Sequence, residues 1–163
     1  MEKFLDIGTI DIISRLLIAI FCGMLIGVER VWAHKTAGMR TYALVAMGSA
    51  LFVIISEAMV KTYIGSIGLN PLHIVAQIVV GVGFLGAGLI FSRDSKVINM
   101  TSATALWVSA GIGMAAGFRL YKVAIIATIL TLFIFIALWF IENQLKKMKF
   151  VAKNNNEDNV QNQ

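Results

Sequence analysis

The sequence predicts an all-α integral membrane protein with five transmembrane helices, its N-terminus outside and its C-terminus in the cytoplasm. Of its 163 residues, 58% are hydrophobic and only 14% are charged, whereas soluble domains carry about 25% charged residues. The apolar residues gather into five stretches of roughly the length that crosses a bilayer, about 20 residues each. The predicted spans are residues 11–28, 41–60, 72–92, 101–117 and 123–141. Basic residues are distributed unequally between the two sets of connecting segments, and this sets the orientation.

The first two spans are predicted to form a helical hairpin with one ionisable residue near the outer end of each. These residues are Arg15 in the first span and Glu57 in the second. Ionisable side chains are costly in hydrocarbon, so they usually mark a buried pair or a functional position. Two interpretations stay open: the residues pair across the spans, or each side chain reaches separately to the outer interface.

Four polar residues are expected at the inner mouth of the same hairpin. Glu29 and Arg30 end the first span, and Arg40 and Thr41 begin the second. An ion pair between Glu29 and Arg40 would close the hairpin and be purely structural. The alternative is that the cluster binds an ion or a partner protein.

The third span is unusually rich in small residues. It is predicted to start at Asn70-Pro71, because proline favours the first position of a helix. Glycine costs roughly 1 kcal/mol relative to alanine inside a helix, so a helix with several is expected to approach another backbone closely. The glycines expected to pack in this way are Gly81, Gly83, Gly86 and Gly88, with Gly113 and Gly117 in the fourth span. Gln77 lies about a turn before the glycines, and its amide is expected to find a partner on a neighbouring helix.

The fourth span opens with hydroxyl-bearing residues. Thr101 and Ser102 are candidates for membrane polar positions, although capping and bonding to backbone carbonyls would explain them equally well. A short connection, residues 118–122, predicts a tight antiparallel turn into the fifth span. Residues 1–145 therefore form the predicted membrane domain. Residues 146–163, basic and then rich in asparagine, are expected to be a disordered cytoplasmic tail.

The orientation depends on the 14 basic residues. Five fall in segments on one side of the predicted spans, and nine fall on the other. The side with more Lys and Arg is usually cytoplasmic. The nine are Arg30, Lys35, Arg40, Arg93, Lys96, Lys146, Lys147, Lys149 and Lys153.

No pattern typical of catalysis is found. His34 and His73 are isolated from each other and from carboxylates at metal-ligand spacing, and there is no phosphate-binding loop or nucleophile motif. Cys22 lies inside a span and cannot form a disulfide within the chain. We therefore expect neither an enzyme nor a nucleic-acid-binding protein. No cofactor is expected from these patterns, and no metal ligands can be assigned.

Several motifs stand out along the chain. The first two spans contain Arg15-Leu16-Leu17-Ile18-Ala19 with Glu29-Arg30, and then Ala37-Gly38-Met39-Arg40-Thr41. The third contains Ala76-Gln77-Ile78-Val79 followed by Gly81-Val82-Gly83-Phe84-Leu85-Gly86-Ala87-Gly88, and the fourth contains Thr101-Ser102-Ala103 with Leu106-Trp107. These motifs resemble the MgtC/SapB family of bacterial membrane proteins. They cover about residues 15–118 in the family's order. The chain departs from the family at Asn99-Met100, where members usually have Gly-Leu, and at Thr101, where some members carry asparagine.

The resemblance implies a multi-pass protein of the bacterial plasma membrane, linked to magnesium homeostasis, stress adaptation and, in some members, virulence. It also implies one of two activities. The chain is either a regulator that contacts a membrane partner such as the F-type ATP synthase, or a transporter or channel for Mg²⁺ or another cation. A structural scaffold is a third alternative. Besides the bilayer, the expected partners are a second copy of the chain, with a dimer as the simplest case, and another membrane protein.

Overall fold

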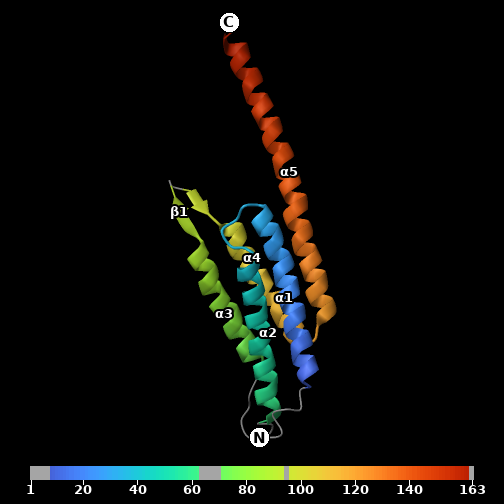
Figure 1. The fold of residues 1–163 in the computed structure, drawn as a ribbon. Coiled ribbons are helices and arrows are strands. Elements are labelled where there is room, and N and C mark those ends of the chain that lie inside the picture. The colour runs from blue at the N-terminus through green and yellow to red at the C-terminus, as the bar shows by residue number, and fades with distance from the viewer. Residues whose placement is uncertain (1–7, 63–70, 94–95, 162–163) are drawn as a thin grey trace. The chain divides into compact units, whose positions relative to one another are not determined.

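The computed structural model describes residues 8–62, 71–93 and 96–161, the last of these from residue 146 onward by backbone alone. Two long helices, α1 (Thr9–Trp32) and α2 (Met39–Thr62), form the predicted hairpin (Figure 1). α1 ends where the Ala33 N–H donates to the Glu29 carbonyl at 2.8 Å and His34 takes a positive φ of 55°. Both helices extend beyond the predicted spans by two to four residues, since the flanking polar residues continue the helical turns.

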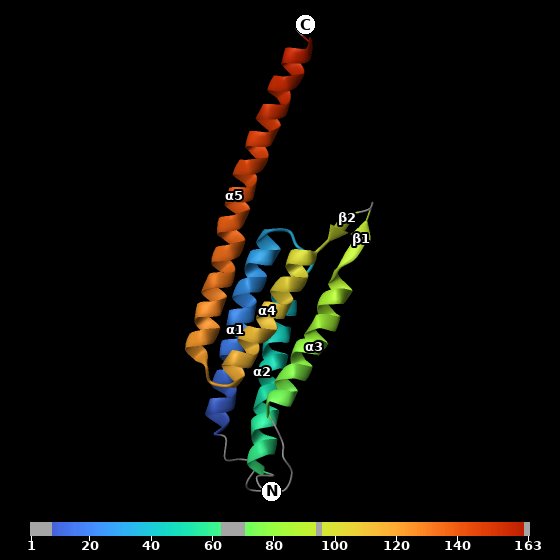
Figure 2. The same ribbon diagram turned by 180° about the vertical axis from the view of Figure 1, so that it is seen from behind.

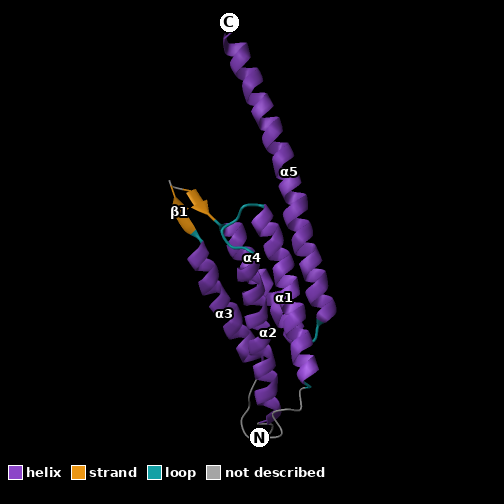
Figure 3. Cartoon of the chain, in the orientation of Figure 1, coloured by secondary structure: helices purple, strands orange, loops and turns teal. Residues whose placement is uncertain are grey.

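The third helix, α3 (Pro71–Leu89), begins at the predicted proline; Asn70 lies outside the described residues. It ends three residues before the predicted boundary, because the chain turns into a small antiparallel hairpin of β1 (Phe91–Arg93) and β2 (Lys96–Ile98) (Figure 3). Asn99 follows with φ 66°, and its side-chain Nδ2 donates to the Leu89 carbonyl at 3.2 Å. This bond joins the base of the β-hairpin to the end of α3. Asn99 gives no side-chain hydrogen bond to the first turn of the next helix.

The fourth helix, α4 (Met100–Gly117), lies between α1 and α3 (Figure 2) and packs against α1, α2 and α3. Ten of its 18 residues are buried, including Ser102, Ser109, Gly113 and Gly117. The small and hydroxyl-bearing residues of α4 let three other helices approach it.

A tight turn of Phe118, Arg119 and Leu120 leads into α5 (Tyr121–Gln161), as the short connection predicted. The chain divides into two compact units, residues 1–131 and residues 132–163. The second unit contains the later part of α5, which stays helical to Gln161. The prediction of a disordered tail after residue 145 therefore differs from the structure. Residues 142–153 contain many good helix formers and neither Gly nor Pro, so nothing in them ends the helix.

The closest backbone approaches are made by glycines of α1 and α4, all against α2 or the residues just before it. A Cβ atom at Gly23 would lie 2.6 Å from the Tyr42 carbonyl oxygen, and one at Gly117 would lie 2.8 Å from the Val53 Cβ. Gly27 meets the Met39 backbone, and Gly113 meets the Ala46 backbone, even more closely. Gly113 and Gly117, which the sequence predicts to pack closely, therefore lie against α2.

The glycines of α3 make no such close approach among the described residues, although Gly86 is buried against α4. Nothing lies within 4 Å of a Cβ built at Gly81, Gly83 or Gly88, and at Gly86 the nearest atom is the Ala103 carbonyl oxygen at an ordinary 3.6 Å. The sequence shows how many glycines a helix has, but the face on which each lies depends on how the helix is rotated in the bundle.

Four of the helices in the described part of the chain are long and apolar enough to cross a membrane: α1, α2, α3 and α5. α4, with 18 residues, is long enough but not apolar enough. Its hydroxyl-bearing residues and glycines lower its hydropathy, and its neighbours cover much of it.

Candidate functional site

Three places in the described residues bring polar side chains near one another: the two ends of the helix bundle and a groove between α2 and α3. At one end, near the start of α1, Arg15 has no exposed surface. Its Nη1 donates to Glu57 Oε2 at 2.5 Å and to the carbonyl of Gly117 at 3.0 Å. A single guanidinium therefore joins α1 to α2 and α4. The structure contains the Arg15–Glu57 pair and not two side chains reaching separately to the interface.

Three further charged residues lie at this end: Asp11, Lys61 and Arg119. We call these three, together with Arg15 and Glu57, the arginine cluster. Arg119, in the turn between α4 and α5, donates from Nε and Nη2 to both carboxylate oxygens of Asp11 at 3.0 and 2.9 Å. Its Nη1 donates to Glu57 Oε1 at 2.8 Å. Asp11 also forms an ion pair with Arg15, one helical turn along α1, and Lys61 Nζ lies 3.3 Å from Glu57 Oε1.

Sequence reasoning did not predict the parts played by Asp11 and Arg119. The signal for Asp11 is its i, i+4 spacing from Arg15, which puts both on one helix face. The signal for Arg119 is its position in a three-residue turn on the same side of the membrane domain.

The arginine cluster has a structural role, because its bonds hold the ends of α1, α2 and α4 together. Mg²⁺ is usually held by one or two carboxylates together with several waters. Each carboxylate here already accepts from two or more cationic groups, so a metal ion would have to displace an arginine. Within the part of the chain that the structure describes, no group of three or more His, Cys, Asp or Glu side chains could hold a metal ion.

At the other end of the hairpin, Glu29 pairs with its neighbour Arg30. The carboxylate oxygen Oε2 of Glu29 accepts from Nε of Arg30, which is buried. Among the described residues no ion pair joins Glu29 to Arg40, so the predicted closing pair is wrong. Arg40 and Thr41 are exposed, since the first turn of α2 turns them away from the bundle. The four predicted residues therefore do not form one cluster.

Next to this end, Tyr42 of α2 is fully buried and tied to α4 by two hydrogen bonds. Its hydroxyl donates to the Ser102 carbonyl at 3.0 Å, and its own carbonyl accepts from Ser109 Oγ at 3.0 Å. The predicted residue Ser102 is therefore buried and acts through its backbone, and its hydroxyl has no hydrogen-bond partner among the described residues. The neighbouring Thr101 is exposed, and its carbonyl accepts from Thr104 Oγ1 at 3.0 Å.

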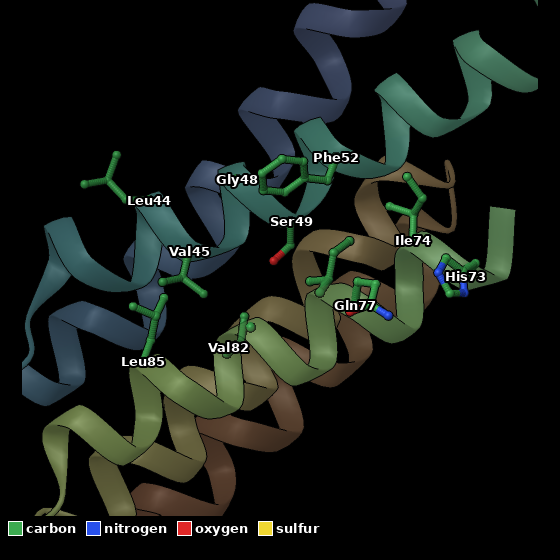
Figure 4. A pocket seen from close by; sticks show the side chains of 12 residues that line it. Leu44, Val45, Gly48, Ser49, Phe52, His73, Ile74, Gln77, Val82 and Leu85 are labelled. Carbon is green, nitrogen blue, oxygen red and sulfur yellow. The ribbon is translucent and has the colours of Figure 1, made fainter.

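The third polar place is an open groove between α2 and α3, with a volume of about 660 Å³, which we call the α2–α3 groove (Figure 4). Gln77 lies in it and is exposed. Its amide is predicted to bond a neighbouring helix, and among the described residues no such bond is found. The lining residues are Leu44, Val45, Gly48, Ser49, Phe52, His73, Ile74, Gln77, Ile78, Gly81, Val82 and Leu85.

Apolar helices of spanning length, with the ion pairs near their ends, define a multi-pass α-helical membrane protein. The sequence model of the MgtC family matches residues 16–144, and the chain belongs to this family. It is 43% identical over 125 residues to a protein of Escherichia coli named "Putative magnesium transporter YhiD", which covers 76% of this chain and 58% of that protein.

Two further relatives bear the name "Protein MgtC". The one from Salmonella typhimurium is 44% identical over 74% of this chain and 49% of its own length. The one from Brucella abortus is 42% identical over 68% of this chain and 44% of its own length. The chain thus spans about half the length of the relatives it matches. No solved structure matches it.

Proposed function

We propose that this protein is a non-enzymatic regulator in the bacterial plasma membrane, which acts by helix contact with a membrane partner and supports magnesium homeostasis and growth in low magnesium. The family and the printed name of the Escherichia coli relative support the link to magnesium. The family resemblance suggests the F-type ATP synthase as the partner. A second copy of the chain is the other partner we propose.

The outward face of α3 is the observation that carries the proposal. Ala76, Gly83 and Ala87 are exposed, and their spacing of seven and four residues places them on one helix face. Nothing lies within 4 Å of a Cβ atom at Gly83. Small residues on a lipid-facing surface let a second helix approach closely, and glycine otherwise only costs helix stability.

We further propose that α4 crosses the membrane with the other four helices, which gives five spans, an outer N-terminus and a cytoplasmic C-terminus. Cysteine labelling tests this in a Cys22→Ala background. A cysteine at the exposed position Leu120 should react with an impermeant maleimide added outside intact cells, and one at Thr36 should react only after permeabilisation. The reverse pattern would contradict the orientation.

Gly83→Leu tests the contact, with Gly111→Leu on α4 as the matched control. Both changes add the same side chain at a helical glycine with no atom within 4 Å of its Cβ. We expect Gly83→Leu to abolish growth in low magnesium and co-purification of the partner while both variants keep the wild-type melting temperature. Equal growth of the two variants would contradict the proposal.

The name of the Escherichia coli relative favours one alternative, transport of Mg²⁺. Purified protein in liposomes that contain a fluorescent Mg²⁺ indicator separates the two functions. A regulator should give the flux of empty liposomes, whereas a transporter should give a flux that rises with the amount of protein and is independent of any partner.

A further inference from the structure

The α2–α3 groove has the size and the lining of a small-molecule site. Its volume of about 660 Å³ is within the range of about 300–1,000 Å³ that is usual for ligand pockets. Its walls are mainly apolar, with Val45 and Phe52 on α2 facing Ile74 and Leu85 on α3 (Figure 4). Three polar side chains, Ser49, His73 and Gln77, interrupt these walls. A few placed polar groups in an apolar pocket are typical of sites that orient an amphipathic ligand.

Ser49 provides an independent sign of a ligand. The residue is only 3% exposed, and no hydrogen bond is found for its hydroxyl among the described residues. Figure 4 shows its oxygen pointing from α2 into the space that faces α3. Hydroxyls inside helices usually return to a backbone carbonyl, as Thr128 and Thr131 do to the carbonyls four residues earlier at 2.8 and 2.7 Å. The Ser49 hydroxyl is therefore left to bond whatever fills the groove.

The opposite wall supplies matching groups. His73 and Gln77 are four residues apart on α3, so they lie on one helix face, and both line the groove. The Gln77 amide can donate and accept, and the imidazole can do the same through its two nitrogens. A polar ring held between the helices could bond Ser49 on one side and Gln77 on the other.

The lining also restricts the class of ligand. None of the twelve residues described as lining the groove carries a fixed charge, so the polar head that fits is neutral. This argues against a phospholipid head group or a fatty-acid carboxylate, which would be buried without a counter-ion. Ser49 also lies near the middle of α2, at a depth that ionic lipid head groups do not reach. A quinone ring is neutral, has carbonyl acceptors for the Ser49 and Gln77 donors, and carries an apolar chain.

We propose that the α2–α3 groove binds a membrane-soluble ligand of the quinone class, with its ring carbonyls at Ser49 and Gln77 and its apolar chain along the walls from α2 and α3. This site is distinct from the outward face of α3 around Gly83, which does not line the groove. Loss of partner contact and loss of quinone binding are therefore separable.

Photolabelling tests the proposal on the full chain in phospholipid nanodiscs, with an azido derivative of decylubiquinone as the probe and unlabelled decylubiquinone as competitor. We expect saturable labelling that maps by peptide mass spectrometry to α2 and α3. Ser49→Ala and Gln77→Leu should each raise the half-saturating concentration roughly 3- to 10-fold, the usual effect of one hydrogen bond. Gly81→Leu should remove the labelling, because it fills the groove at a position with no atom within 4 Å of its Cβ.

Ser56→Ala is the matched control, a buried serine of α2 that is not among the residues described as lining the groove. It should leave the half-saturating concentration unchanged, and Gly83→Leu should do the same even where partner contact is lost. Three results would overturn the proposal: labelling that does not saturate, labelling spread over the lipid-facing surfaces of α1 and α5, or equal affinity in Ser49→Ala, Gln77→Leu and Ser56→Ala.

Discussion

Arg15 carries a permanent charge at a position with no exposed surface, and the surrounding residues explain how the fold tolerates it. Its guanidinium has Asp11 and Glu57 as counter-ions and a backbone carbonyl from the end of α4 as a further acceptor. Burying a charge costs several kcal/mol unless it is paired and hydrogen-bonded. The pairing of Arg15 is therefore a condition of folding at this end of the bundle.

Removing this charge should cost far more than removing an exposed partner of the same carboxylate. We expect Arg15→Gln to lower the free energy of unfolding in mixed micelles by about 3 kcal/mol, because Asp11 and Glu57 lose their buried partner. Lys61→Gln, which removes a half-exposed amine from the same Glu57, should cost under about 1 kcal/mol. Comparable losses in both variants would mean that Arg15 is not the central residue of the arginine cluster.

At the scale of helices, the fold depends on which glycines face a neighbour. Gly113 lies so close to the backbone of α2 at Ala46 that a methyl group cannot fit, whereas Gly88 has no atom within 4 Å of its Cβ. The two substitutions to alanine should therefore have opposite signs. Gly113→Ala should lower the melting temperature because α2 and α4 must separate. Gly88→Ala should raise the free energy of unfolding by about 0.5–1 kcal/mol through helix propensity.

The melting temperature of both variants in one detergent measures this difference. A fall for both would mean that Gly88 is packed against something, and no change at Gly113 would mean that α2 and α4 are further apart than described.

Much of the element order could be predicted from the sequence. Apolar runs bounded by polar residues locate the helices, Pro71 marks the start of α3, and Gly117 marks the end of α4. The features that could not be predicted depend on how each helix is rotated about its axis and on pairs between residues far apart in the sequence. Glu29 bonds Arg30 and not Arg40, and Arg119 reaches Asp11 across 108 positions of sequence, because helix phase and crossing geometry decide which ends meet. The hairpin of β1 and β2 was missed because three-residue strands carry almost no periodic signal.

Over the whole membrane domain, the closely packed part is the group of α1, α2 and α4, and α3 joins it on one side only. α3 packs against α4 and α2 through residues such as Ile78 and Val82. Ala76, Gly83 and Ala87 on its opposite face are exposed within the described part of the chain. The proposed regulator uses that face, and the proposed ligand site uses the groove beside it.

Site-specific photo-crosslinking in living cells tests the central claim most directly. A photoreactive amino acid at Ala87, on the outward face of α3, is compared with one at the exposed position Met24 on α1 during growth in low magnesium. We expect Ala87, and not Met24, to give a discrete protein adduct, identified by mass spectrometry as a subunit of the F-type ATP synthase or a second copy of this chain. Adducts with lipid alone at Ala87, or the same protein adducts at both positions, would contradict the proposed role of α3 as a contact helix.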